Sequence, residues 1–281
     1  MKNVPISMIP YANMAPYETL GPPANCYFVN CTPRNSIAAL KERSVWAAAV
    51  PVGGLAALEG EIEPVGLFGI AAYREVMSVL FFSDRPFEEI KAPHTVRLTD
   101  ESASSVRLLN LLLVDANGFD SIPSISVPGA KANGELVIGD TALGWHHEWE
   151  QRGSIKGYGH MTDLADRWYR QYQLPFVFAR WVVRTDAPER VRQSMADWLE
   201  LFAGQEDTLI ERSVPRVASR LNLPESYVHR YLKVIRRRLD TSDQEGQRRF
   251  LEEWRLKGMA GAVSWFQNEA KIERDRIHKH G

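Results

Sequence analysis

The chain of 281 residues is long enough for one large domain or two of ordinary size. Hydrophobic residues make up 44% of it and charged residues 25%, which is the composition of a globular protein and excludes a disordered or fibrous one. The 34 basic and 35 acidic residues leave a net charge of −1, so the clear positive excess of a dedicated nucleic-acid binder is absent, although a local basic pocket stays open.

The segments that would place the chain in a membrane or outside the cell are not evident in the sequence. No apolar run approaches the roughly 18 residues of a membrane-spanning helix, and the segment after Met1 lacks the apolar core of a secretory signal. Cys26 and Cys31 match neither a redox motif nor a zinc set, so we expect free thiols. These features favour a cytoplasmic protein.

Short apolar runs rich in β-forming residues alternate with segments of helical period, which is typical of α/β proteins. Thr32 before Pro33 predicts a helix start, and Asp163 predicts another, because Leu164, Trp168 and Tyr172 then share one face. From Pro188 onward the sequence predicts helices only. The expected strands are residues 5–9, 45–50, 76–82, 95–98, 135–138 and 176–183, and a further helix is expected at 102–113.

This order predicts a two-lobed α/β fold of the periplasmic-binding-protein type (type II) with a helical C-terminal tail and a small anionic ligand between the lobes. Such a fold requires two crossings between lobes, which we place near residues 84–94 and 178–184. The expected first lobe is then discontinuous, with residues 1–93 and 182–281, and the second lobe is 94–181.

The cluster of Ser102, Ser104 and Ser105 is the most suggestive local feature of the sequence. It stands between a strand and a helix start, where unpaired backbone N–H groups and the helix dipole favour an anion. The alternative is that one serine caps the helix and the others face solvent. Both interpretations stay open at this point.

Three other polar residues stand where a ligand site is expected. Asn13 follows the first strand, the usual position for ligand contacts in open α/β sheets, although asparagine also favours turns. Ser78 is the one hydroxyl inside an apolar run, so it either bonds to backbone or faces a polar cavity. Asp140 is expected first as a helix cap and second as a residue facing the cleft.

Motifs for several other chemistries are missing from the sequence. There is no Gly-rich phosphate loop, H-E-x-x-H or G-x-S-x-G, and the adjacent His146 and His147 make a poor metal pair, so we expect no metal site and no nucleophile–base pair. Residues 217–231 resemble a helix-turn-helix and are followed by the basic run 236–238, but a pair of packed tail helices explains this stretch equally well.

Six segments, in one order along the chain, resemble motifs of the chorismate dehydratase family, which acts in the futalosine route to menaquinone. Residues 11–16 are similar to Y/F-L-N-x-x-P, 49–52 to a short strand ending in proline, and 76–83 to V-x-S-V-L-L-F-S. Residues 102–108 are similar to S-R-T-S-V-x-L, and 138–143 to I-G-D-x-A-L. The most specific stretch, 163–181, resembles D-L-G-x-x-W followed by G-L-P-F-V-F-A-x-W.

The resemblance implies a two-lobed solute-binding-protein fold and a hydro-lyase that removes water from chorismate, a small dicarboxylate, without a metal or organic cofactor. It implies that Asn13 and Ser78 are the main polar catalytic residues and that the substrate's own enolpyruvyl carboxylate takes the ring proton. Ser102, Ser104 and Ser105 would bind the other carboxylate, with Asp140 and Arg74 also at the substrate. No nucleic acid or membrane is expected as a partner.

Several positions depart from the family pattern. Ala103 stands where the family has arginine, and Arg74 and Glu75 stand where it has glycine and proline, so Arg74 is either a replacement cation or an exposed residue. Gly53 and Trp46 also change the expected lining of the ligand pocket. These departures keep open a second hypothesis, a non-catalytic small-anion-binding protein or a sister enzyme with another ligand on the same scaffold.

Overall fold

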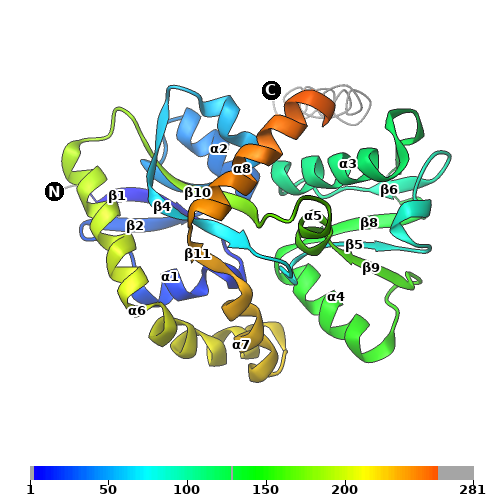
Figure 1. Cartoon of the computed structure of the whole chain (residues 1–281). Coiled ribbons are helices and arrows are strands. Elements are labelled where there is room, and N and C mark those ends of the chain that lie inside the picture. The colour runs from blue at the N-terminus through cyan, green and yellow to red at the C-terminus, as the bar shows by residue number, and fades with distance from the viewer. Residues whose placement is uncertain (1–2, 128, 259–281) are drawn as a thin grey trace.

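The computed structural model describes residues 3–127 and 129–258 and shows two β-sheets side by side, each covered by helices (Figure 1). The first sheet has six strands and the second has five. This is the mixed α/β, two-sheet architecture that the alternation of strand and helix patterns predicts. Cys26 and Cys31 are free thiols, as expected.

The first sheet is mixed. Strand β1 pairs in parallel with β2 and β3, whereas β10 runs antiparallel to both β3 and β4, and β11 is antiparallel to β4. Its strands, in spatial order, are β11 (Arg236–Arg238), β4 (Ile62–Ala72), β10 (Phe176–Arg184), β3 (Ala47–Pro51), β1 (Val4–Met8) and β2 (Cys26–Asn30).

The second sheet is also mixed. Strand β5 is antiparallel to its two neighbours, β8 and β9, while β6 pairs in parallel with β7 and β8. The strands, in spatial order, are β7 (Ser124–Ile125), β6 (Thr95–Arg97), β8 (Gly134–Ile138), β5 (Val79–Ser83) and β9 (His160–Asp163).

Helices cover both faces of each sheet (Figure 1). Helices α1 and α6 lie on one face of the first sheet and α2 on the other; α3 and α4 lie on opposite faces of the second sheet, and α7 and α8 lie where the two halves meet. The helices are α1 (Ala15–Leu20), α2 (Pro33–Lys41), α3 (Ala103–Asn117), α4 (Gly139–Arg152), α5 (Leu164–Tyr172), α6 (Glu189–Leu221), α7 (Glu225–Val234) and α8 (Thr241–Glu253).

Aromatic side chains on the central strand β10 anchor the core of the first half. Trp181 is fully buried and packs edge-on against Tyr17 of α1 and Trp198 of α6. Phe176 packs against Phe250 of α8 on the opposite face of the strand. Because alternate residues of a strand point to opposite faces, this one strand ties helices to both sides of the sheet.

The chain passes between the two sheets earlier than the sequence suggests. Strand β5, which the expected boundary at residue 93 places in the first lobe, hydrogen-bonds to β8 and β9 of the second sheet. The first crossing therefore lies between Ala72 and Val79, and the return lies in the few residues before Phe176. As a division into folding domains, 1–93 with 182–281 and 94–181 stays a prediction, and residues 259–281 lie outside the described residues.

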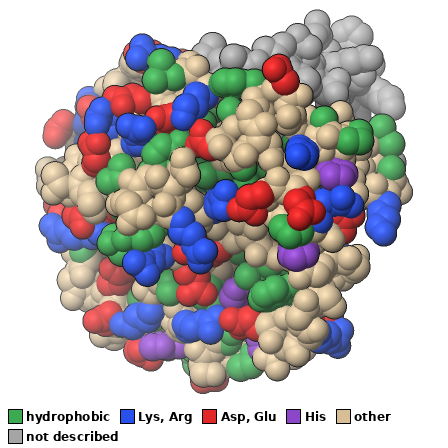
Figure 2. Space-filling view, turned by 45° about the vertical axis from the view of Figure 1, so that its right-hand side comes forward, with side chains coloured by type: hydrophobic (Ala, Val, Ile, Leu, Met, Phe, Trp, Pro, Cys, Tyr) green, Lys and Arg blue, Asp and Glu red, His purple; other side chains and the backbone are tan. Residues whose placement is uncertain are grey.

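The C-terminal region is helical, with one exception to the expectation of helices only. Residues 236–238 form the short strand β11, which extends the first sheet at its edge. Among the described residues, no helix is both long and apolar enough to cross a bilayer. On the face drawn in Figure 2, basic and acidic side chains are interspersed rather than gathered by sign.

Candidate functional site

Asn13 lies in the short helical turn η1 (Ala12–Met14), between β1 and α1. Its backbone is held at two points: Asp140 Oδ1 accepts the Ala12 N–H at 2.7 Å, and Arg237 donates to the Asn13 carbonyl oxygen at 3.1 Å. The side-chain oxygen of Asn13 is buried and has no hydrogen-bond partner among the described residues. A buried side-chain oxygen without a partner, on a turn whose backbone is held at two points, is a candidate ligand contact.

Ser78 lies at the end of the segment that joins the two sheets, directly before β5, and is 3% exposed. Its hydroxyl donates to the carbonyl oxygen of Val76 at 3.3 Å and accepts the phenolic O–H of Tyr231 at 3.1 Å. Burial raises the pKa of Tyr231 above its ordinary value, so the phenol stays protonated. The hydroxyl of Ser78 therefore lies in a polar contact between the joining segment and α7.

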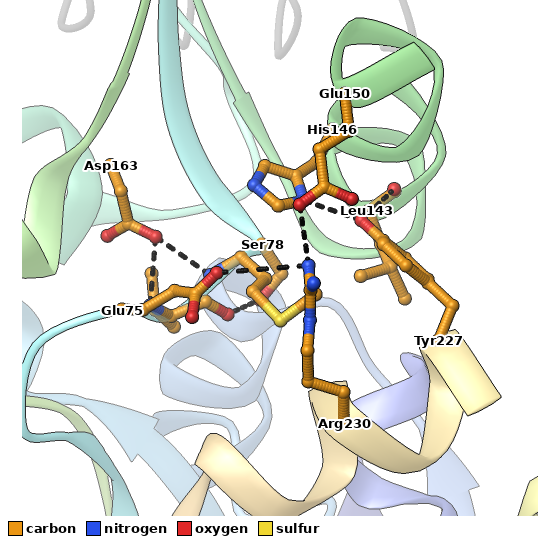
Figure 3. Close-up of polar contacts among 10 residues, drawn as sticks. Glu75, Ser78, Leu143, His146, Glu150, Asp163, Tyr227 and Arg230 are labelled. Atoms are coloured by element: carbon orange, nitrogen blue, oxygen red, sulfur yellow. Dashed lines mark hydrogen bonds and ion pairs between the residues drawn. The ribbon is translucent and has the colours of Figure 1, made fainter.

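Asp163 holds the backbone in front of Ser78 (Figure 3). Its Oδ2 accepts the N–H groups of Val76 and Met77 at 2.9 and 2.8 Å, while Oδ1 caps α5. Met77 has a φ of +60°, a left-handed conformation that a residue with a side chain rarely adopts. Burial raises the pKa of Asp163 to about 7, although the N–H donors around it act in the opposite direction.

The dipeptide Gly139–Asp140 at the start of α4 connects the two candidate residues. The Gly139 N–H donates to the Ser78 carbonyl at 2.8 Å, and the Asp140 carboxylate holds the turn that carries Asn13. Gly139 has a φ of +63°, and a Cβ there would lie about 3.0 Å from the Tyr11 ring, so only glycine fits. Asn13 and Ser78 are thus anchored on neighbouring residues of one turn.

Asp140 is not the cap of α4, which corrects the first of the two interpretations made from sequence. The helix begins at Gly139, its N-cap position is Ile138, and no side chain caps it. The Asp140 carboxylate instead reaches across to the first half, where Oδ2 forms an ion pair with Arg220 of α6 at 2.7 Å. Both carboxylate oxygens are therefore already engaged, and Asp140 holds the two halves together.

The three serines lie at the start of α3, as predicted, and all are buried. Ser102 is the N-cap and accepts the Ser105 N–H, and the hydroxyls of these two serines lie 3.0 Å apart. The hydroxyl of Ser104 accepts the N–H of Gly53 at 2.9 Å and donates to the Phe178 carbonyl at 3.3 Å. The capping interpretation is thus confirmed for Ser102, but its expectation that the other serines face solvent is wrong: Ser105 is buried, and Ser104 joins the two halves.

Gly53, one of the departures from the family pattern, lies against this helix start. A Cβ at Gly53 would lie about 3.0 Å from the Cα of Ser104, tighter than ordinary van der Waals contact. Arg107 of α3 also donates to the Gly53 carbonyl. Glycine at this position therefore allows the backbone at residue 53 to approach α3 closely.

Arg74 does not supply a buried cation. Its side chain is exposed, and its guanidinium carbon lies 4.6 Å from the centre of the Tyr169 ring. The neighbouring Glu75 forms a 3.9 Å ion pair with Arg230 of α7, which also pairs with Glu150 of α4 at 2.7 Å (Figure 3). The position of Arg74 therefore favours the second interpretation, an exposed residue, because its side chain stacks on the Tyr169 ring at the surface.

Helix α7 also packs on α4 through a buried histidine. His146 is 3% exposed, and its Nδ1 lies 2.5 Å from the Tyr227 hydroxyl (Figure 3). Burial lowers the pKa of His146; Arg230 and His147 act in the same direction and Glu150 opposes them. The imidazole is therefore neutral in this contact.

This neutral histidine predicts a loss of stability in mild acid. Below its ordinary pKa of 6.5 the unfolded chain binds a proton that the folded protein resists, so the free energy of unfolding falls with falling pH. His146 accounts for up to about 1.4 kcal/mol between pH 7.5 and 5.5. Urea unfolding at both pH values measures this difference, which should shrink in His146→Phe. An equal difference in the variant would contradict the assignment.

The basic run 236–238 is not arranged for contact with phosphates. Arg237 is fully buried and pairs with Glu206 at 3.0 Å, Arg236 pairs with Asp240 and Asp243, and Arg238 pairs with Glu200. Within residues 3–127 and 129–258, no group of three or more His, Cys, Asp or Glu side chains is placed to hold a metal ion. The three arginines of this run therefore form ion pairs within the chain, one of them in the interior and two nearer the surface.

Sequence reasoning missed two residues of the site, Tyr231 and Arg237. Each lies in the C-terminal helical region, and each reaches a residue more than 150 positions earlier in the chain. No local spacing signals such contacts. Asp163 was recognised as a helix start, but its hydrogen bonds to Val76 and Met77 depend on the pairing of β5 with β9.

The family model described as menaquinone biosynthesis matches residues 4–255, nearly the whole chain. The chain belongs to this menaquinone-biosynthesis family. A curated relative, named chorismate dehydratase, from Thermus thermophilus is 28% identical over 204 residues, which cover 66% of this chain and 70% of the relative. The resemblance of the six segments to the chorismate dehydratase family is thus confirmed.

Solved structures similar to this menaquinone-biosynthesis family member include binding proteins. Protein AF1704 from Archaeoglobus fulgidus aligns with a TM-score of 0.63 at 15% identity, covering 91% of this chain and 98% of that one. The periplasmic aliphatic sulphonate binding protein SsuA from Escherichia coli aligns with a TM-score of 0.58 at 15% identity, covering 92% and 88%. The fold is therefore periplasmic-binding-protein-like, as the sequence predicted.

Proposed function

We propose that this chain is a carbon–oxygen lyase that dehydrates chorismate to 3-[(1-carboxyvinyl)oxy]benzoate in menaquinone biosynthesis. Family membership and the similarity to a relative named chorismate dehydratase support the proposal. The observation that carries it is the common anchorage of Asn13 and Ser78 on Gly139–Asp140, with the buried oxygen of Asn13 unsatisfied. Asn13 and Ser78, which stand at the matching motif positions, are thus both anchored at the start of α4.

The reaction removes a ring proton and the neighbouring ring hydroxyl as water. The C–H electron pair becomes part of an aromatic ring as the C–O bond breaks, which strongly favours the product. The substrate's enolpyruvyl carboxylate accepts the ring proton, so the protein needs no strong base of its own. Its task is to hold a dianion and to place hydrogen-bond donors where charge develops.

We assign the two residues according to their hydrogen-bonding capacity. The Asn13 amide N–H donates to the enolpyruvyl carboxylate, and its unsatisfied oxygen accepts a hydrogen bond from the ring hydroxyl, which keeps its proton. Ser78 donates to the oxygen that leaves, because the Tyr231 O–H already occupies an acceptor position on the Ser78 hydroxyl. The departing oxygen leaves as hydroxide and combines with the abstracted proton to give water.

The second carboxylate of the substrate is assigned to the start of α3. Ser102 and Ser105 lie there with the positive end of the helix dipole, and their hydroxyls contact each other rather than the other half. Ser104 has both hydroxyl positions engaged with Gly53 and Phe178, so its role is to join the halves. Asp140 is assigned a similar structural role, because its carboxylate accepts the Ala12 N–H. Direct contact with the substrate is unfavourable, because a carboxylate would repel a dianion.

Incubation of the purified protein with chorismate tests the proposal, with ring aromatisation followed by ultraviolet absorbance and the product by mass. We expect the loss of one water. Ser78→Ala should reduce turnover by roughly a hundredfold because a donor to the leaving oxygen is removed. Ser83→Ala is the matched control, since Ser83 is a fully buried serine of β5 bonded to the Arg85 carbonyl.

A binding protein without catalysis is the second candidate. The outward position of Arg74 and the presence of Ala103 favour it, because the site then holds fewer cations than the family pattern supplies. Calorimetric titration with chorismate discriminates the two. Saturable binding with no chemical change would support the binding protein and contradict the lyase.

A further inference from the structure

Two side chains from the α7–β11 segment reach the two residues assigned to catalysis. Tyr231 of α7 donates to the Ser78 hydroxyl, and Arg237 of β11 donates to the Asn13 carbonyl oxygen. Both side chains are fully buried, so the bonds are made away from water. The C-terminal helical region is therefore part of the site and does more than cover the first sheet.

The contact with Tyr231 fixes the direction in which Ser78 can donate. A serine hydroxyl has one proton and two acceptor positions. The Tyr231 O–H fills one acceptor position at 3.1 Å, so the serine proton has to point elsewhere; it reaches the Val76 carbonyl at a long 3.3 Å. A bond of that length is weak and is readily exchanged for a better acceptor.

We propose that Tyr231 is a positioning residue that holds Ser78 as a hydrogen-bond donor toward an oxygen acceptor of the ligand. The inference rests on the proposed function, in which that acceptor is the leaving ring oxygen. Donation from the phenol also polarises the Ser78 hydroxyl, because chained hydrogen bonds strengthen one another. Burial keeps the phenol protonated, so the direction of donation does not reverse in the neutral pH range.

Without the phenol, the Ser78 hydroxyl can rotate and accept where it should donate. Tyr231→Phe removes only the hydroxyl and keeps the ring in its buried position. We expect kcat for chorismate to fall about tenfold with KM changed less than about threefold, since one hydrogen bond to the transition state is weakened. Because Tyr231 acts through Ser78, adding Tyr231→Phe to Ser78→Ala should lower kcat no further.

Tyr227 gives the matched control on the same helix. Its hydroxyl is also buried, but it bonds the Leu143 carbonyl and His146 rather than Ser78. Tyr227→Phe should cost a similar amount of thermal stability and leave kcat within about twofold of the wild type. Equal kcat losses in both variants would show a merely structural role and overturn the proposal, as would a Tyr231→Phe variant with wild-type kcat.

Failure of the proposed function is separately visible in the same set of proteins. If the wild type leaves chorismate unchanged, the lyase assignment fails, and the Tyr231–Ser78 contact is then judged on the ligand-free proteins. The double variant should lose less in thermal midpoint than the sum of the two single losses, because both single variants break the same bond. Strictly additive losses would overturn the positioning role.

Discussion

Asn13→Ala is expected to lower chorismate turnover at least about a hundredfold while the thermal midpoint changes by no more than a few degrees. The loss follows from removing both the donor and the acceptor assigned to the reacting part of the substrate. Stability is preserved because the side-chain oxygen has no partner to lose, and the turn is held through its backbone by Asp140 and Arg237. Steady-state kinetics and thermal unfolding measure the two effects.

Two further variants sharpen this expectation. Asn13→Asp keeps the shape but replaces the amide donor with a negative charge beside a dianion, so it should be as inactive as the alanine variant. Asn35→Ala removes an exposed asparagine of α2 and should behave as the wild type. Normal turnover in Asn13→Ala, or rescue by aspartate, would show that Asn13 is not the contact that we assign.

The elements with local signals could be predicted from the sequence. Thr32 followed by Pro33 starts α2, and the Thr32 hydroxyl accepts the Asn35 N–H as a cap should. Asp163 caps α5 in the same way. The binding-protein-like fold and the family followed from such signals together with the order of the motifs. For the two helix starts, the information lies within a few neighbouring residues.

Strand β4 gave no clear signal, for reasons visible in its neighbours. It contains Pro64, Gly66 and Gly69, which ordinarily weaken a strand, and its pairing with β10 is irregular at two points. Gly69 is required because a Cβ there would lie 2.4 Å from the Ala179 carbonyl oxygen. The proline and glycines that ordinarily weaken a strand are thus accommodated by the irregular pairing of β4 with β10.

The candidate site was only partly predictable, because tertiary contacts, which have no local sequence signal, hold its residues in place. Asn13 and Ser78 stand in recognisable motifs, but the contacts that hold them come from the distant Tyr231 and Arg237. The sequence left the role of Arg237 open, because nothing local shows that Glu206 and three backbone carbonyls surround its guanidinium. Which polar side chain is buried is settled by packing rather than by spacing.

Asp163→Ala is expected to lower the free energy of unfolding by at least about 3 kcal/mol at pH 7.5, measured by urea denaturation. The half-buried carboxylate accepts four backbone N–H groups, and hydrogen bonds to charged groups contribute about 1.5–3 kcal/mol each before the cost of desolvating the charge. Two of those donors belong to Val76 and Met77, so the left-handed backbone at Met77 loses its support.

Asp166, three residues further along α5, separates this effect from the loss of any carboxylate. It is half-buried and pairs with Arg170 one turn away, a contact that contributes no more than about 0.5 kcal/mol on a helix surface, so Asp166→Ala should be nearly neutral. Since Asp163 also places the segment that ends at Ser78, the folded fraction of Asp163→Ala should turn chorismate over more slowly as well. Wild-type stability and turnover in that variant would mean that the joining segment is held by its strands alone.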